Sequence, residues 1–197
     1  MKKLFLITVL TLACAAVASA QVPVPFSLYA GGLMSFPNAP TEFKDAYKNG
    51  FHGMVGLGYK AMPVLQLVGK AEYHHFGYDL SQIDGVSSGA RAVWLFGGDL
   101  RVGLNLPASP IKPYILGGGG LARVTFTPFE GTNLSLTTAL NDVLPAAQNK
   151  FYYNFGGGFE FKIAPIASLF AQVRYVRIST DNEATSFVPL TLGLKFF

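Results

Sequence analysis

The chain contains eight long segments in which apolar and polar residues alternate, and the connections between these segments are alternately short and long. In residues 88–104, for example, Trp94 and Phe96 fall on one face of a strand, whereas Asp99 and Arg101 fall on the other. A period of two residues is typical of strands whose two faces meet different surroundings. The length of the segments suits tilted strands that cross a membrane. The pattern therefore predicts a β-barrel of the bacterial outer membrane.

The predicted strands lie within residues 24–36, 51–61, 64–77, 88–104, 111–127, 151–163, 167–180 and 186–197. Short connections at 61–63, 105–110 and 164–166 are expected to face the periplasm, and longer ones at 37–50, 78–87, 128–150 and 181–185 the outside. Because lipid cannot satisfy an open strand edge, the sheet has to close on itself. We expect an all-β fold, an eight-stranded antiparallel up-and-down transmembrane β-barrel. A soluble exported β-sandwich is the rival fold, but its strands would be shorter and its turns less regular.

The first twenty residues are predicted to be a cleaved signal peptide. Lys2 and Lys3 precede an apolar run at 4–17, and residues 18–20 form the small-residue cleavage site Ala-Ser-Ala. Residues 21–197 would then be the barrel domain. A lipoprotein signal ending at Cys14 is the alternative, and it fits less well because the Ala-x-Ala site lies downstream.

Composition limits the partners of the mature chain. Cys14 is the only cysteine, so a mature chain starting at Gln21 has neither a disulfide nor a cysteine metal site. The full chain has 15 basic and 11 acidic residues, and two of the basic residues belong to the signal peptide. Such a small excess is weak evidence for nucleic-acid binding, and an exported chain would not meet nucleic acid. We expect outer-membrane lipid and lipopolysaccharide as its surroundings.

The two faces of the predicted strands have different compositions. The proposed lipid-facing positions in four of the strands are Phe26, Leu28, Ala30, Gly32, Met34, Phe51, Val55, Leu57, Tyr59, Tyr153, Phe155, Phe159, Phe161, Val188, Leu190, Leu192, Leu194 and Phe196. The predicted interior charges are Lys60, Lys70, Glu72, Arg91, Asp99, Arg101, Arg123, Glu160, Lys162 and Arg174. Because an eight-stranded barrel is only wide enough for side chains to fill it, we expect a packed interior with crossing ion pairs. A charged pore is the alternative.

Two glycine runs and two loop segments need a separate explanation. The runs at 117–120 and 156–158 are not nucleotide loops, because an alternating strand pattern follows them where a helix would be required. They instead predict a curved, close-packed wall with room for neighbouring aromatic rings.

Residues 40–48 and 134–148 are predicted to contain local helix. The apolar face of 134–148 is expected over the barrel mouth or the membrane interface, or against a partner.

Several segments carry a resemblance to a known family. They are Phe43-Lys44-Asp45 with Gly50-Phe51, the Gly-Leu-Gly-Tyr run at 56–59, Lys112-Pro113-Tyr114, the Val-Arg-Tyr-Val run at 173–176 and the terminal phenylalanine. The chain resembles the outer-membrane β-barrel domain family, which includes opacity-type proteins and eight-stranded OmpA- and OmpX-like barrels. The resemblance covers the whole mature chain, and its motifs are specific for the barrel family and not for a function. Similar members of the family include adhesins, structural envelope proteins and many with no assigned activity.

The resemblance also implies an assembly signal at the C-terminus, read by the barrel-assembly machinery. Here the signal would be Phe196 and Phe197. Phe196 is in phase with the lipid-facing positions, Phe197 lies one residue beyond, and Lys195 stands where a second aromatic residue is common in the family.

Three functions are compatible with these features of the sequence. The first is a non-catalytic structural or surface-interaction role, with an extracellular ligand at loops 37–50 and 128–150, because binding residues concentrate in loops on rigid scaffolds. The second is a narrow channel for small solutes. The third is a lipid A-modifying enzyme, in which His75 would approach Ser87 or Ser88 with Asp79 or Asp84 orienting it. We expect no catalysis and no cofactor.

A metal site is a further alternative. His52, Glu72 and His74 share the inward phase, and imidazole and carboxylate groups bind zinc or copper. We expect an ordinary hydrogen-bonded cluster instead.

Overall fold

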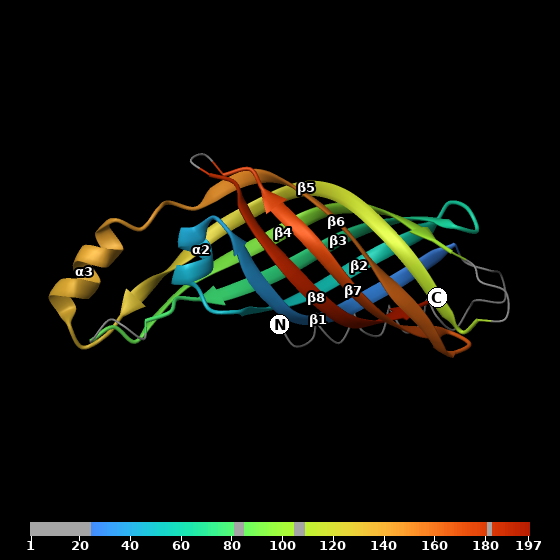
Figure 1. Ribbon diagram of the computed structural model, residues 1–197, viewed down its shortest axis with the longest axis horizontal. Helices are drawn as coiled ribbons and strands as arrows, with labels where there is room; N and C mark the ends of the chain where they lie inside the picture. Colours follow the sequence, from blue (N-terminus) through green and yellow to red (C-terminus); the bar gives the residue numbers. More distant parts are fainter. Residues whose placement is uncertain (1–24, 81–84, 105–108, 181–182) are drawn as a thin grey trace, which may run out of the picture.

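Eight antiparallel strands, each paired with its neighbours along the chain, form the wall of the molecule, and the last strand pairs with the first to close a barrel (Figure 1). The computed structural model describes residues 25–80, 85–104, 109–180 and 183–197. The predicted eight-stranded up-and-down barrel is thus confirmed. The predicted signal peptide at 1–20 lies outside the described residues and stays a prediction.

The strands match the predicted segments to within three residues at each end. They are β1 (Phe26–Ala39), β2 (Gly50–Lys60), β3 (Leu65–Gly77), β4 (Ser88–Gly103), β5 (Ile111–Glu130), β6 (Gln148–Ala164), β7 (Ala167–Ile178) and β8 (Thr185–Phe196). Two helices, α2 (Thr41–Ala46) and α3 (Leu134–Asp142), fall within the segments predicted to contain helix. No helix in the described part of the chain is long and apolar enough to cross a membrane.

The outer surface of the wall is apolar. Phe51 and Leu57 of β2 are 58% and 57% exposed, and Phe155 of β6 is 57% exposed. The residues of β2 that alternate with Phe51 and Leu57 are buried inside the barrel. Large exposed apolar side chains around a closed barrel are what an outer-membrane barrel presents to lipid.

Glycines in the wall make room for aromatic rings that point into the barrel. A Cβ atom added to Gly158 would lie 2.7 Å from the Tyr114 hydroxyl, and one added to Gly193 would lie 2.6 Å from the ring of Phe170. Both distances are too short for a real side chain. The interpretation of the glycine run at 156–158 as a close-packed wall is therefore confirmed, since β6 continues through it as a strand.

The two ends of the barrel differ. The turns between β2 and β3 and between β6 and β7 are short and lie at the same end as the start of β1 (Figure 1). In outer-membrane barrels short turns face the periplasm, so we call this end the inner mouth. Both helices lie at the opposite end, the outer mouth (Figure 1).

The helix that covers the outer mouth is α2, and α3 lies beyond it. Phe43 of α2 is 3% exposed and packs among residues of the barrel wall. Strands β4 and β5 stay paired out to Ser88 and Glu130, past the start of β6, and α3 follows β5 at the far tip of the molecule (Figure 1). Leu134 and Val143, at the two ends of α3, are each 76% exposed. The apolar face of 134–148 therefore does not cover the mouth, and the other two expected places for it, the membrane interface and a partner, stay predictions.

Candidate functional site: the barrel interior and its two mouths

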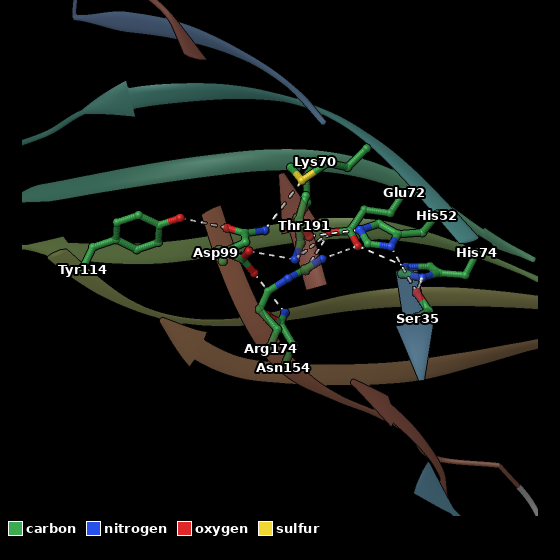
Figure 2. Close-up of polar contacts among 12 residues, drawn as sticks. Ser35, His52, Lys70, Glu72, His74, Asp99, Tyr114, Asn154, Arg174 and Thr191 are labelled. Carbon is green, nitrogen blue, oxygen red and sulfur yellow. Dashed lines mark hydrogen bonds and ion pairs between the residues drawn. The ribbon is translucent and has the colours of Figure 1, made fainter. Parts of the chain in front are cut away.

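The middle of the barrel is filled by a compact network of charged side chains. Arg174 donates two hydrogen bonds of 2.7 Å to the carboxylate of Glu72. The Lys70 ammonium lies 2.9 Å from Glu72 and 2.7 Å from Asp99, and Asn154 donates to Asp99 at 2.9 Å. These residues come from four strands and meet across the lumen (Figure 2). Two acids and two bases thus neutralise each other, as buried charges require.

A pair of histidines extends this network toward the outer mouth. The rings of His52 and His74 stack with their centroids 4.9 Å apart, and Ser35 Oγ lies within 3.1 Å of Nδ1 in both (Figure 2). His52 Nε2 lies 2.9 Å from the Thr191 hydroxyl, and His74 Nε2 lies 3.1 Å from Glu72. All four ring nitrogens have a hydrogen-bonding neighbour, so the geometry is that of a hydrogen-bonded cluster. Within the described ranges, no three His, Cys, Asp or Glu side chains are grouped to hold a metal ion.

A second ion-pair group lies toward the inner mouth. The carboxylate of Glu160 lies 3.1 Å from Arg101 and 2.9 Å from Lys195. The Arg101 guanidinium stacks 3.8 Å from the centre of the Tyr114 ring and 4.9 Å from that of Tyr29. Glu160, Arg101, Lys195 and Tyr114 border a cavity of about 600 Å³ at the inner mouth.

The outer mouth is closed by apolar side chains. Phe43 packs edge-on against Phe76, with ring centroids 5.2 Å apart, and Phe76 packs against Phe187 at 5.4 Å. The Arg91 guanidinium lies 4.8 Å from the Phe43 ring and donates a hydrogen bond to the hydroxyl of Thr185. The lumen thus ends in a hydrophobic plug above the polar network.

Most of the predicted interior charges lie inside the barrel or at its rim. Six are buried: Lys70, Glu72, Arg91, Asp99, Arg101 and Arg174. Glu160 is half-buried, whereas Lys60 and Lys162 are exposed and line the inner cavity.

Arg123 was wrongly placed in the interior. It is exposed and pairs across the sheet with Trp94 on the outer surface. Its neighbours Ala122 and Val124 are the residues of β5 that point inward there. The error arose because the charge of Arg123 was given more weight than its phase in the strand.

Lys195 is an interior charge that sequence reasoning missed. It is 7% exposed and contacts Glu160. The signal was present in β8, where Lys195 is in phase with buried Thr191 and out of phase with Leu192 and Leu194.

His75 lies on the outer surface, away from the lumen. Its ring stacks on Phe51 at 5.0 Å, and its Nδ1 lies 3.4 Å from the Tyr73 hydroxyl. Ser87 donates its hydroxyl hydrogen to the carbonyl of Glu130 instead. Among the described residues no hydrogen bond joins His75 to a serine, and Asp84 lies outside them.

At the C-terminus, Phe196 continues the outward face of β8, and Phe197 is 43% exposed. The Phe197 amide donates to the carbonyl of Ile166, and its ring lies 4.7 Å from the Lys195 ammonium. That assembly machinery reads these two phenylalanines stays a prediction.

Solved structures with a similar fold come from outer-membrane barrels. Neisserial surface protein A matches with a TM-score of 0.63 at 16% identity, over 87% of this chain and 96% of that one. Ail of Yersinia pestis, solved in complex with the heparin analogue sucrose octasulfate, matches with a TM-score of 0.53 at 16% identity, over 87% and 97%. OprG of Pseudomonas aeruginosa gives 0.52 at 16% identity, over 87% and 94%. At such low identities these likenesses concern the fold alone.

No curated protein matched the sequence. Residues 5–196 do match the family described as outer membrane protein beta-barrel domain, which is nearly the whole chain. Together with the closed eight-stranded barrel and its apolar outer surface, this match shows that the chain belongs to the outer membrane protein beta-barrel domain family and resides in the bacterial outer membrane.

Proposed function

We propose that the protein is a non-catalytic surface protein whose outer hairpin, made of β5, α3 and β6, contacts molecules outside the cell. The observation that carries the proposal concerns α3, which lies at the far tip of the outer end of the molecule (Figure 1). It is the part of the chain that a partner approaching the cell meets first.

The outer hairpin is held in one conformation by its own polar contacts. The side chain of Asn141 accepts from the Phe129 amide at 2.7 Å and donates to the Phe129 carbonyl at 3.0 Å. Asn133 caps α3 by accepting from the Leu136 amide at 3.2 Å. A rigid scaffold that presents surface groups in a fixed arrangement is the usual basis of recognition by loops.

The tip presents apolar side chains to water. Leu134 and Val143 are each 76% exposed and flank α3. Apolar groups that a folded element holds in water are available for burial against another surface. Ail, a protein of the same fold, was solved with a heparin analogue bound, and we assign this chain a binding role of the same general kind.

The predicted ligand loop at 37–50 has less support than the loop at 128–150. Its helix α2 turns Phe43 into the barrel, where the side chain is 3% exposed. This loop serves to close the mouth, so we place recognition on the outer hairpin.

The test compares cells that express the wild type with cells in which residues 125–147 are replaced by Asn-Gly, a two-residue turn that suits a hairpin between the paired residues Val124 and Gln148. The readouts are attachment to immobilised extracellular-matrix proteins and aggregation between cells. We expect the replacement to lower attachment or aggregation several-fold, and the double variant Leu134→Asn, Val143→Asn to reproduce the loss. A faster-migrating band of unboiled protein shows that each variant still forms the barrel.

Substitution of an exposed residue on α2, Glu42→Gln, is the matched control and should leave both readouts unchanged. Equal attachment and aggregation by the wild type and the replacement variant would refute the role of the outer hairpin.

A further inference from the structure

Cationic side chains outnumber acidic ones in the lining of the inner cavity. This cavity lies at the opposite end of the barrel from the outer hairpin. Five cationic side chains and a single acidic side chain line it: Lys60, Arg101, Lys112, Lys162, Lys195 and Glu160. The network in the middle of the barrel has two acids for two bases, so this imbalance is particular to the inner mouth.

The one carboxylate is already engaged. Glu160 contacts Arg101 and Lys195, within 3.1 Å of each. Among the described residues, Lys60, Lys112 and Lys162 make no ion pair. Three exposed ammonium groups therefore remain around a concave space without an ion-pair partner in the described part of the chain.

A guanidinium at the wall of the cavity is held in place and incompletely bonded. Arg101 is 5% exposed and lies between the rings of Tyr114 and Tyr29. Its Nη1 donates to Glu160, whereas its buried Nη2 has no hydrogen-bond partner among the described residues. A fixed guanidinium fork with spare N–H groups is the arrangement that proteins use for phosphate and carboxylate groups.

We propose that the inner cavity binds phosphate-bearing anions on the periplasmic side. The lysines supply the attraction, and Arg101 with the hydroxyls of Ser27 and Ser168 supplies directed donors at the cavity wall. A volume of about 600 Å³ is within the usual range of small-molecule sites, about 300–1,000 Å³. Soluble polyphosphates and phospholipid headgroups of the inner leaflet share this chemistry.

The test is calorimetric titration of inorganic pyrophosphate into the mature protein in uncharged detergent micelles. We expect saturable binding to one site that weakens as salt rises from about 50 to about 200 mM, since salt screens exposed charges. In the variant Lys60→Gln, Lys112→Gln, Lys162→Gln the affinity should fall by about tenfold or more, which corresponds to about 1.4 kcal/mol.

The matched control removes the same charge elsewhere. Lys44→Gln, Arg123→Gln, Arg177→Gln changes three exposed cations outside the cavity, and its affinity should stay within about twofold of the wild type. Equal weakening in both triple variants, or no saturable heat with the wild type, would overturn the proposal. Heat-modifiable migration on a gel verifies that all three proteins are folded.

A second experiment distinguishes phospholipid headgroups from soluble anions as the ligand of the cavity. The titration is repeated in nanodiscs of phosphatidylcholine and of phosphatidylglycerol. If anionic headgroups occupy the cavity, pyrophosphate binds more weakly in phosphatidylglycerol, and the difference disappears in the lysine triple variant. If the lipid makes no difference, the ligand is a soluble anion. Either result supports the anion site, and neither depends on whether the outer hairpin binds a partner.

Discussion

Glu72 is the residue on which the polar interior converges. Arg174, Lys70 and His74 all contact its carboxylate, and Glu72 itself is 1% exposed. Removing one member of a buried ion-pair group leaves the others charged, buried and unpaired. We predict that Glu72→Gln lowers the free energy of unfolding by about 3 kcal/mol or more. Urea unfolding in micelles, followed by the fluorescence of the single tryptophan, Trp94, measures this loss.

Substitutions of two other carboxylates should give smaller losses of stability than Glu72→Gln, and so test the prediction for Glu72. Glu160→Ala should also destabilise the barrel, but less than Glu72→Gln, because Glu160 is half-buried and water can reach its partners. Glu42→Gln changes an exposed carboxylate of α2 and should leave the urea midpoint unchanged. A midpoint for Glu72→Gln equal to that of the wild type would show that the network does not stabilise the fold.

At the scale of elements, the two helices of the outer end have different tasks. Phe43 of α2 is buried in the apolar plug, whereas Leu134 of α3 is exposed. We predict that Phe43→Ala destabilises the protein by about 3 kcal/mol, since truncation of a buried aromatic ring leaves a cavity. Leu134→Ala should change stability little, because the side chain is already in water. Urea unfolding measures both, and comparable losses in the two variants would contradict this division of tasks.

The sequence indicated both helices but not their tasks. The apolar spacing of 134–148 suggested a face that needed cover, and that of 40–48 was no stronger. Which helix reaches the mouth depends on the strands that carry it. Strand β5 stays paired with β4 out to Glu130 and Ser88, whereas β6 begins at Gln148 opposite Val124, so it is β5 beside β4 that carries α3 away from the lumen (Figure 1). Periodicity within a helix contains no information on that distance.

At the scale of the whole molecule, the lumen is obstructed in two successive places. The network around Glu72 and Arg174 fills the middle, and the plug around Phe43 closes the outer mouth. We predict that the wild-type protein shows no single-channel conductance in planar bilayers, because packed side chains fill the lumen at both places. A general porin added to the same membrane verifies that the bilayer reports openings. Stepwise openings of uniform size with the pure wild type would restore the channel hypothesis.

The sequence by itself determined the wall of the barrel. Side chains in a strand alternate strictly between the two faces, so the sequence order of Phe51, Leu57 and Tyr59 was enough to place them on the lipid side. The same rule would have placed Arg123 outside and Lys195 inside, had phase been given priority over charge. The rule holds because alternation is a property of the local backbone.

Tertiary structure alone decided which interior groups meet. Arg174 and Glu72 are 102 positions apart in the sequence and form a two-bonded pair only because closure and strand stagger bring β7 opposite β3. The same closure gathers Lys60, Lys112 and Lys162 around one cavity and leaves Phe43 as the plug. Contacts across a lumen depend on the relative shift of eight strands, and that shift is set by the closed hydrogen-bond register of the whole barrel.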